Sequence, residues 1–163
     1  MKIFNCLRFS LLLSAFALAG CDKPASPAST AKVDPPKGGT EEKHDHGKGP
    51  NGGVVMDLGK YHAEFTVDHD KKECTILFVT ADDKDAKALP VTCKELTVTT
   101  KPSKTKEGTV VPAMTIKMLP KDEKEGKAAK FVGTDLTLGN VADFEGTVTG
   151  EIDGKPSQGT FKE

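Results

Sequence analysis

Arginine is nearly absent from this sequence. Arg8 is the only arginine among 163 residues, so the rest of the chain lacks the planar guanidinium group that binds phosphate and carboxylate through paired hydrogen bonds. The formal net charge is −1 at pH 7, and charges of both signs are interspersed without a basic patch. These absences argue against phosphoryl transfer and predict that no nucleic acid is bound.

Catalytic signatures are absent as well. Residues 51–163 contain only two serines, Ser103 and Ser157, and both lie in polar, turn-like stretches. No Gly-x-Ser-x-Gly elbow, His-Glu-x-x-His pair or glycine-rich phosphate loop occurs in the chain. We therefore expect a protein that is not an enzyme.

A long hydrophobic run is also missing. The apolar stretch at residues 9–19 is about half as long as the ~20 residues of a membrane-spanning helix. It follows Lys2 and Arg8 and ends in small residues, an order typical of a secretion signal. The ending Leu-Ala-Gly-Cys, with its cysteine at Cys21, resembles the bacterial lipobox. This resemblance implies that residues 1–21 form a lipoprotein signal peptide ending at a lipidated Cys21, with palmitate among its acyl chains. An ordinary signal peptide is the alternative.

These features predict a lipoprotein of the bacterial cell envelope, held at a membrane by its lipid anchor and facing the periplasm or the outer space. Loss of the two basic residues in the signal would leave 142 residues with a formal charge of −3. That length suits one domain plus a tail. The predicted partners are the membrane, through the anchor, and an envelope protein.

Residues 22–50 have the composition of a tether. They contain five prolines among Ser, Thr, Lys and Gly, and Val33 is their only large aliphatic residue. Such a segment cannot bury enough apolar surface to fold, so we predict a disordered tether. From residue 51 onward the pattern changes, and residues 51–163 are predicted to form the folded domain.

Short alternating runs mark the strands of this domain. In residues 61–67 the apolar side chains share one parity, which predicts a half-buried strand with His62 on its polar face. Leu136 and Leu138 indicate a short strand, and Asp153-Gly154 predicts a tight hairpin turn. About seven to nine short strands separated by turns predict an all-β fold, an immunoglobulin-like two-sheet β-sandwich.

Cys74 and Cys93 are the only cysteines of the predicted domain. In an exported protein two such cysteines can form a disulfide, because the space outside the cytoplasm permits oxidation. We expect this bond, with two buried free thiols as the main alternative and a thiolate metal site as a weaker one.

The best candidate for a chemical site is His44-Asp45-His46. Two imidazoles that flank a carboxylate can converge on one divalent ion, and imidazole suits copper, zinc or nickel. His62 could add a ligand if the start of the domain folds back over its first hairpin. A copper or zinc site is therefore one interpretation, and a solvated linker with scattered histidines is the other. Met114 and Met118 could bind monovalent copper, but their shared parity with an isoleucine favours a place in the core.

A family resemblance follows from the same region. The run His-Gly-Lys-Gly-Pro-Asn-Gly-Gly at residues 46–53, followed by Leu58-Gly59 and Tyr-His-Ala-Glu at residues 61–64, is similar to a small β-domain of bacterial envelope lipoproteins. It also resembles the His-Gly-Pro-x-Gly-Gly opening of heavy-metal efflux periplasmic adaptor proteins of the RND type. The chain departs from these adaptors because Lys48 interrupts the motif and the helical hairpin and lipoyl-like segments are missing.

The resemblance implies a stand-alone accessory or sensing domain near metal homeostasis. Three functions follow as hypotheses. The first is a lipid-anchored, non-catalytic envelope module that binds a protein or a metal ion. The second is a divalent-metal chaperone or sensor, and the third is a purely structural surface module.

Overall fold

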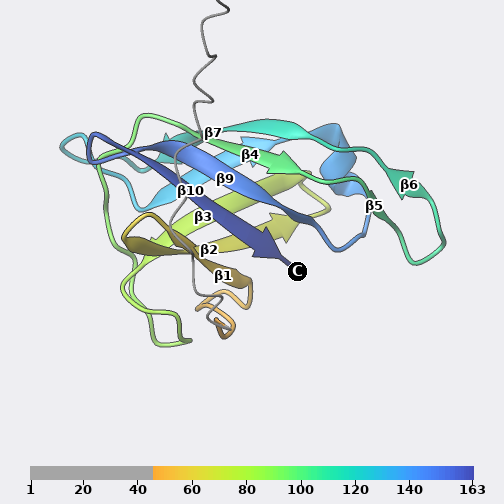
Figure 1. Ribbon diagram of the computed structural model, residues 1–163, viewed down its shortest axis with the longest axis horizontal. Helices are drawn as coiled ribbons and strands as arrows, with labels where there is room; N and C mark the ends of the chain where they lie inside the picture. The colour runs from red at the N-terminus through yellow and green to blue at the C-terminus, as the bar shows by residue number, and fades with distance from the viewer. Residues whose placement is uncertain (1–45) are drawn as a thin grey trace, which may run out of the picture. The chain divides into compact units, whose positions relative to one another are not determined.

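The computed structural model describes residues 46–163, and this part of the chain is all-β (Figure 1). Within it, ten strands and one short 3-10 helix follow one another, and no α-helix is present. The elements are β1 (Val54–Leu58), β2 (Tyr61–Asp68), β3 (Glu73–Val79), β4 (Leu96–Thr100), β5 (Ser103–Lys104), β6 (Val110–Val111), β7 (Thr115–Lys121), β8 (Lys130–Thr134), η1 (Leu136–Gly139), β9 (Glu145–Ile152) and β10 (Lys155–Lys162). The all-β prediction is confirmed. No helix among these residues has the length and apolar character needed to cross a membrane.

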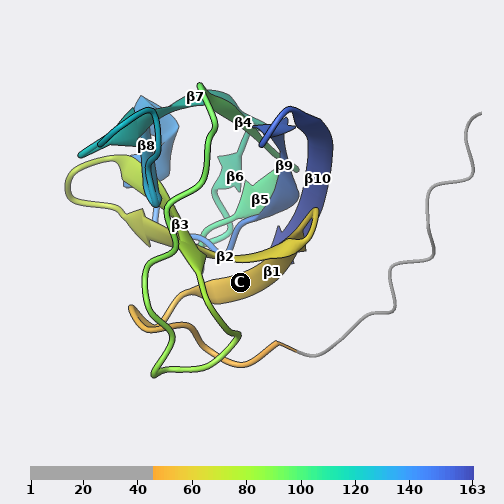
Figure 2. The same ribbon diagram turned by 90° about the vertical axis from the view of Figure 1, so that its left-hand side faces the viewer.

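Eight of these strands form one antiparallel sheet in the order β1-β2-β3-β8-β7-β4-β9-β10. Seen end on, the strands wrap around a common interior, and the sheet is nearly barrel-shaped (Figure 2). Strand β7 joins the two halves, because residues 115–118 pair with β4 and residues 119–121 pair with β8. The predicted two-sheet, immunoglobulin-like sandwich is not confirmed. The short β5–β6 pair forms a separate hairpin that extends from one end of the sheet (Figure 1).

The first and last strands of this order lie side by side. A Cβ atom on Gly159 of β10 would come within 2.1 Å of the carbonyl oxygen of Asp57 in β1, so only glycine permits this approach. On the inner side, Phe65 of β2 stacks on Phe161 of β10 with ring centroids 4.0 Å apart. Backbone proximity and aromatic packing together bring the two edges of the sheet to one another.

The interior is filled by alternate residues of the strands, as the period of a β-strand requires. Its largest fully buried hydrophobic side chains include four phenylalanines, and Phe78 meets Phe131 edge to face at 5.7 Å. The core members are drawn from all eight strands of the sheet and from the loops at its ends. One continuous core therefore lies inside the curved sheet.

Two tight turns define the hairpins that matter for the site. The β9–β10 loop is Asp153-Gly154, and both residues have positive φ, at 50° and 75°, as a type I′ turn requires. This confirms the predicted turn. The β1–β2 loop likewise contains two residues, of which Gly59 has a φ of 68°. The predicted strand at Leu136 and Leu138 is wrong, because Asp135 caps a short 3-10 helix there and accepts a hydrogen bond from the backbone N–H of residue 137.

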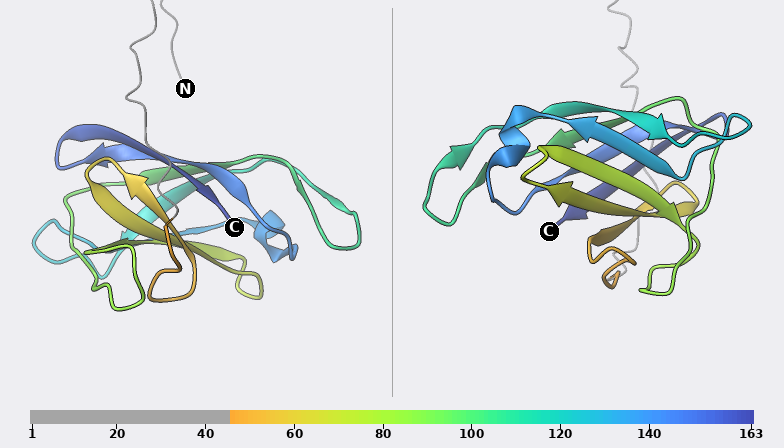
Figure 3. Two further views of the ribbon diagram at one scale, coloured as in Figure 1. Left: turned by 60° about the horizontal axis from the view of Figure 1, so that its bottom comes forward. Right: turned by 180° about the vertical axis from the view of Figure 1, so that it is seen from behind.

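The first described residues cover the outer face of the β1–β2 hairpin. This stretch, residues 46–53, is drawn in orange in Figure 3 and is called the N-terminal segment below. Lys48 pairs with Val54, and Gly52 donates a backbone hydrogen bond to Gly49 at 2.9 Å, which closes a turn. Residues 46–50 belong to the predicted tether, yet they pack against the domain.

Candidate metal centre

The β1–β2 hairpin presents an aspartate and a histidine side by side. Asp57 and His62 are direct cross-strand partners. Asp57 lies three residues after Val54, and one further residue pair separates the two side chains from the turn. Their neighbours Met56 and Ala63 are buried in the core, so the alternation of the strands turns Asp57 and His62 toward the outer face. Both side chains are about one-third exposed, at 36% and 37%.

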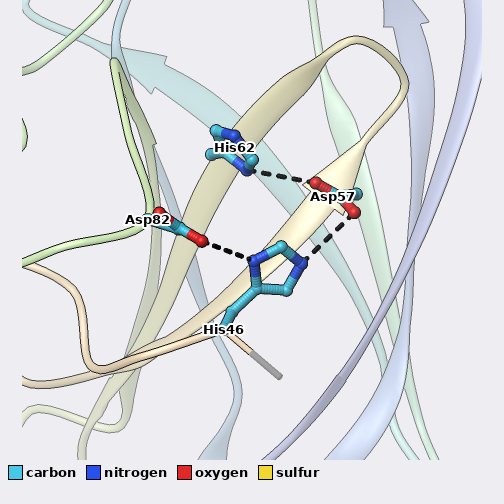
Figure 4. Close-up of polar contacts among 4 residues, drawn as sticks. All are labelled: His46, Asp57, His62 and Asp82. Carbon is cyan, nitrogen blue, oxygen red and sulfur yellow. Dashed lines mark hydrogen bonds and ion pairs between the residues drawn. The ribbon is translucent and has the colours of Figure 1, made fainter. Parts of the chain in front are cut away.

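The N-terminal segment brings a second histidine to this pair. His46 lies over the hairpin, with its ring centroid 5.5 Å from that of His62. Its Nε2 is 3.2 Å from Oδ2 of Asp57, while Nδ1 of His62 is 3.1 Å from Oδ1 of the same carboxylate (Figure 4). One ligand atom from each of the three residues lies within 4.8 Å of the others. Asp57 therefore stands between two imidazoles that come from different parts of the chain.

His62 has an unsatisfied ring nitrogen. Its Nδ1 is shielded from solvent and, among the described residues, has no hydrogen-bond partner. The Asp57 oxygen is close enough for an ion pair but lies in the wrong direction for a hydrogen bond. A buried polar atom of this kind costs free energy unless another group completes its bonding. The nitrogen is thus available to a bound cation.

A second carboxylate orients His46 from the opposite side. Asp82, in the loop after β3, lies with its Oδ2 3.4 Å from Nδ1 of His46 (Figure 4). This hydrogen bond is the main reason that the pKa of Asp82 lies below its ordinary value. An ionised carboxylate only accepts hydrogen bonds, so Nδ1 of His46 donates to Asp82 in the tautomer that carries its proton there. Nε2 then faces Asp57.

The four side chains match the chemistry of a divalent transition metal. Both ring nitrogens of His46 face carboxylates, and they can both donate only when the ring is protonated. A metal ion at Nε2 would take the place of that second proton. Tetrahedral zinc with ligands at about 2.1 Å holds them about 3.4 Å apart, whereas the three ligand atoms lie within 4.8 Å of one another, so they would draw closer around a bound ion.

Charge and ligand type narrow the choice of ion. Two carboxylates and two neutral imidazoles carry two negative charges, which a divalent cation balances. Mixed nitrogen and oxygen ligands favour zinc, nickel or divalent copper over magnesium and calcium, which prefer oxygen alone. The candidate metal centre is thus His46, Asp57 and His62 as ligands, with Asp82 behind His46.

Sequence reasoning identified part of this centre. His46 and His62 are brought together as proposed, by a segment that folds back over the first hairpin. His44, Asp45 and the predicted lipidation site Cys21 lie outside the described residues. Asp57 and Asp82 were missed. The sequence did contain a signal for Asp57, because a two-residue turn after Leu58 places Asp57 opposite His62.

The two cysteines are separate free thiols. Cys74 lies in β3 and contacts Sδ of Met118 at 3.4 Å, whereas the Cys93 thiol contacts the backbone carbonyl of Glu95 at 3.2 Å. The expected disulfide is therefore not present, and the alternative of two buried free thiols describes the structure. Cys93 lies in the loop before β4, and β8 and β7 stand between β3 and β4 in the sheet.

Burial governs the chemistry of both thiols. Desolvation raises the pKa of the Cys74 thiol to about 12, and it also raises the pKa of Cys93. Thiols of this kind are poor metal ligands, because the thiolate is the binding form. Met114 and Met118 are buried in the core, as their alternation predicted.

No protein-family model matches the chain, and comparisons with curated proteins and with solved structures also find no match. The resemblance to efflux adaptors thus stays a prediction from the motif alone. The class defined by fold and geometry is an all-β domain with a histidine–aspartate–histidine cluster formed by its first hairpin and the N-terminal segment.

Proposed function

We propose that this protein is a lipid-anchored, non-catalytic module of the bacterial envelope whose β-domain binds a divalent transition-metal ion, in the manner of a metal chaperone or sensor. The observation that carries the proposal is the convergence of His46, Asp57 and His62, with an imidazole nitrogen left without a hydrogen bond. The anchor and the envelope location rest on the sequence at residues 1–21.

Partial exposure supports reversible binding. Asp57 and His62 remain about one-third exposed, and three protein ligands leave a fourth coordination position for water or a partner's ligand. A structural metal site is usually closed by four protein ligands. An ion held at the outer face of a hairpin could therefore be exchanged with another protein, as a chaperone or sensor requires.

Calorimetric titration of the purified full chain with zinc and with divalent copper tests this proposal. We expect one ion per chain at the centre. Replacing His62 or Asp57 by alanine should weaken binding by more than about 10-fold, since each removal takes away a direct ligand. His69→Gln is the matched control, because His69 lies in the β2–β3 turn and bonds to the carbonyl of Leu138 instead. Equal affinity in all variants would exclude the centre.

The same titration addresses the sequence prediction for the neighbouring residues. If His44 and Asp45 contribute ligands, His44→Ala should weaken binding as strongly as His62→Ala. If only His44→Ala weakens binding, the ion binds to the tether and not to the hairpin, and the proposed centre is wrong.

A further inference from the structure

A buried carboxylate holds the N-terminal segment in place. Glu64 lies on the same face of β2 as His62, two residues further along, yet it is completely buried. The N-terminal segment covers it. An ionised side chain is tolerated in such a position only when hydrogen bonds replace the lost water.

Those hydrogen bonds all come from the segment. Oε1 of Glu64 accepts the backbone N–H groups of Asn51 at 2.8 Å and of Gly53 at 2.9 Å, and Oε2 accepts the side-chain amide of Asn51 at 2.8 Å. Hydrogen bonds to an ionised acceptor are about twice as strong as neutral ones. Glu64 therefore fixes residues 51–53 through both main chain and side chain.

Glycines make this close fit possible. A Cβ atom on Gly49 would lie 2.6 Å from Cδ of Glu64, and one on Gly53 would lie 2.2 Å from the carbonyl oxygen of Phe65. The backbone of the segment thus rests directly on β2 and on the carboxylate. The Gly49–Gly52 turn then directs the chain back toward His46.

The metal ligands come from two pieces of chain that this contact joins. Asp57 and His62 belong to the hairpin, while His46 belongs to the N-terminal segment, three residues before Gly49. Three residues span at most about 10 Å, so the docked position of the turn decides whether His46 reaches Asp57. The hydrogen bonds to the Glu64 carboxylate come from Asn51 and Gly53 of the segment.

We infer that Glu64 is a positioning residue that couples docking of the N-terminal segment to metal binding at His46, Asp57 and His62. This inference rests on the proposed function. Linkage makes the coupling reciprocal: docking raises the affinity for the ion, and the ion stabilises docking by the same factor. When the segment is undocked, only Asp57 and His62 can bind the ion. The apparent affinity for the ion therefore falls as the fraction of docked protein falls.

Two substitutions separate this role from general destabilisation. Glu64→Ala removes the acceptor and should weaken zinc binding by at least tenfold in calorimetry of the full chain. Glu64→Gln keeps an oxygen for the two backbone N–H groups, and the Asn51 amide can turn its own oxygen toward the new NH₂ group. Zinc affinity of Glu64→Gln should thus lie between those of the parent and Glu64→Ala, because the hydrogen bonds are kept but lose the contribution of the ionised acceptor.

Spectroscopy reports the ligands directly. Electron paramagnetic resonance of the copper(II)-loaded full chain should show two coupled imidazole nitrogens in the parent and in Glu64→Gln, but one in Glu64→Ala. Two nitrogens in Glu64→Ala would overturn the positioning role. A thermal unfolding curve of each variant checks that the domain is folded.

Hydrogen exchange of the unaltered chain supplies a test that needs no variant. Adding zinc should slow exchange of the Asn51 and Gly53 amide protons at least tenfold. This factor should equal the loss of zinc affinity that Glu64→Ala causes. Amides that zinc leaves unchanged would overturn the coupling even though zinc binds. Absence of zinc binding in the parent would instead overturn the proposed function and the coupling with it.

Discussion

Asp57 and His62 face each other across the β1–β2 hairpin, and the carboxylate of Asp57 is held between the ring of His62 and the ring of His46. The pair is local in sequence, whereas His46 arrives from a segment that must dock on the outer face of the sheet. The candidate metal centre thus combines a rigid hairpin with a separately positioned ligand, and each part can be altered alone.

Asp82→Asn tests whether the carboxylate of Asp82 orients His46 for metal binding. The carboxylate accepts the Nδ1 hydrogen of His46 and so presents Nε2 to the ion. An amide holds that proton less strongly, and loss of such an outer partner costs about 10- to 100-fold in metal affinity. Because Asp82 is half exposed, we expect about tenfold weaker zinc binding in calorimetry. Asp85→Asn, in the same exposed loop, should leave zinc affinity unchanged, and equal losses in both variants would contradict the assignment.

Local signals in the sequence account for the strands and for one turn. Alternation identifies β2 and places His62 on its outer face, and Asp153-Gly154 encodes its own type I′ turn. The alternation at Leu136 and Leu138 was too short to separate a strand from a 3-10 turn. A strand would place Leu136 and Leu138 on the same face, whereas in the 3-10 helix Leu138 is buried and Leu136 is exposed.

Long-range pairing explains what the sequence could not reveal. Cys74 of β3 pairs with Gly133 of β8, and no local pattern specifies a partner so distant in the chain. The number of sheets depends on such pairings, so the two-sheet expectation had no direct support. Asp82 was hidden for the same reason, because a loop residue reaches His46 only after β3 and the N-terminal segment are both in place.

Gly159→Ala tests how the edges of the sheet meet. The new methyl group would lie 2.1 Å from the carbonyl oxygen of Asp57, so β10 must move away from β1. Overpacking of this kind costs about 1–3 kcal/mol, which urea denaturation measures. Gly139→Ala is the control, since its Cβ would meet only the flexible side chain of Lys72 at 3.3 Å. Similar stability of the parent and Gly159→Ala would show that β1 and β10 are not in close contact.

The thiols of Cys74 and Cys93 should be reduced and protected. Desolvation raises both pKa values, that of Cys74 to about 12, so few thiolates exist at pH 8. Iodoacetamide should therefore leave both unmodified in the native full chain and alkylate both in urea without reductant. Peptide mass spectrometry reads the outcome. A Cys74–Cys93 linked peptide would instead establish the disulfide that the sequence predicted.

Asp153 should make the stability of the domain depend on pH. Its carboxylate accepts hydrogen bonds from the Tyr61 hydroxyl and, at 3.1 Å, from the Thr92 backbone N–H, and Lys60 lies 3.6 Å away. The bond from Tyr61 is the largest of several causes that hold the pKa of Asp153 below the ordinary 3.8. The ionised form is thus favoured by folding. Its stabilisation is complete above the unfolded pKa and is lost as pH falls through the folded pKa.

Asp153→Asn isolates this contribution, because asparagine tolerates the positive φ of the turn. Urea denaturation should show the variant less stable by on the order of 1 kcal/mol at pH 7, and the difference should shrink toward zero below the folded pKa. Asp122→Asn is the matched control: Asp122 is exposed and also has positive φ, at 56°, and its replacement should change stability little. A stability difference for Asp153→Asn that stays constant from pH 7 to pH 2 would mean that the turn, and not the carboxylate charge, accounts for the loss.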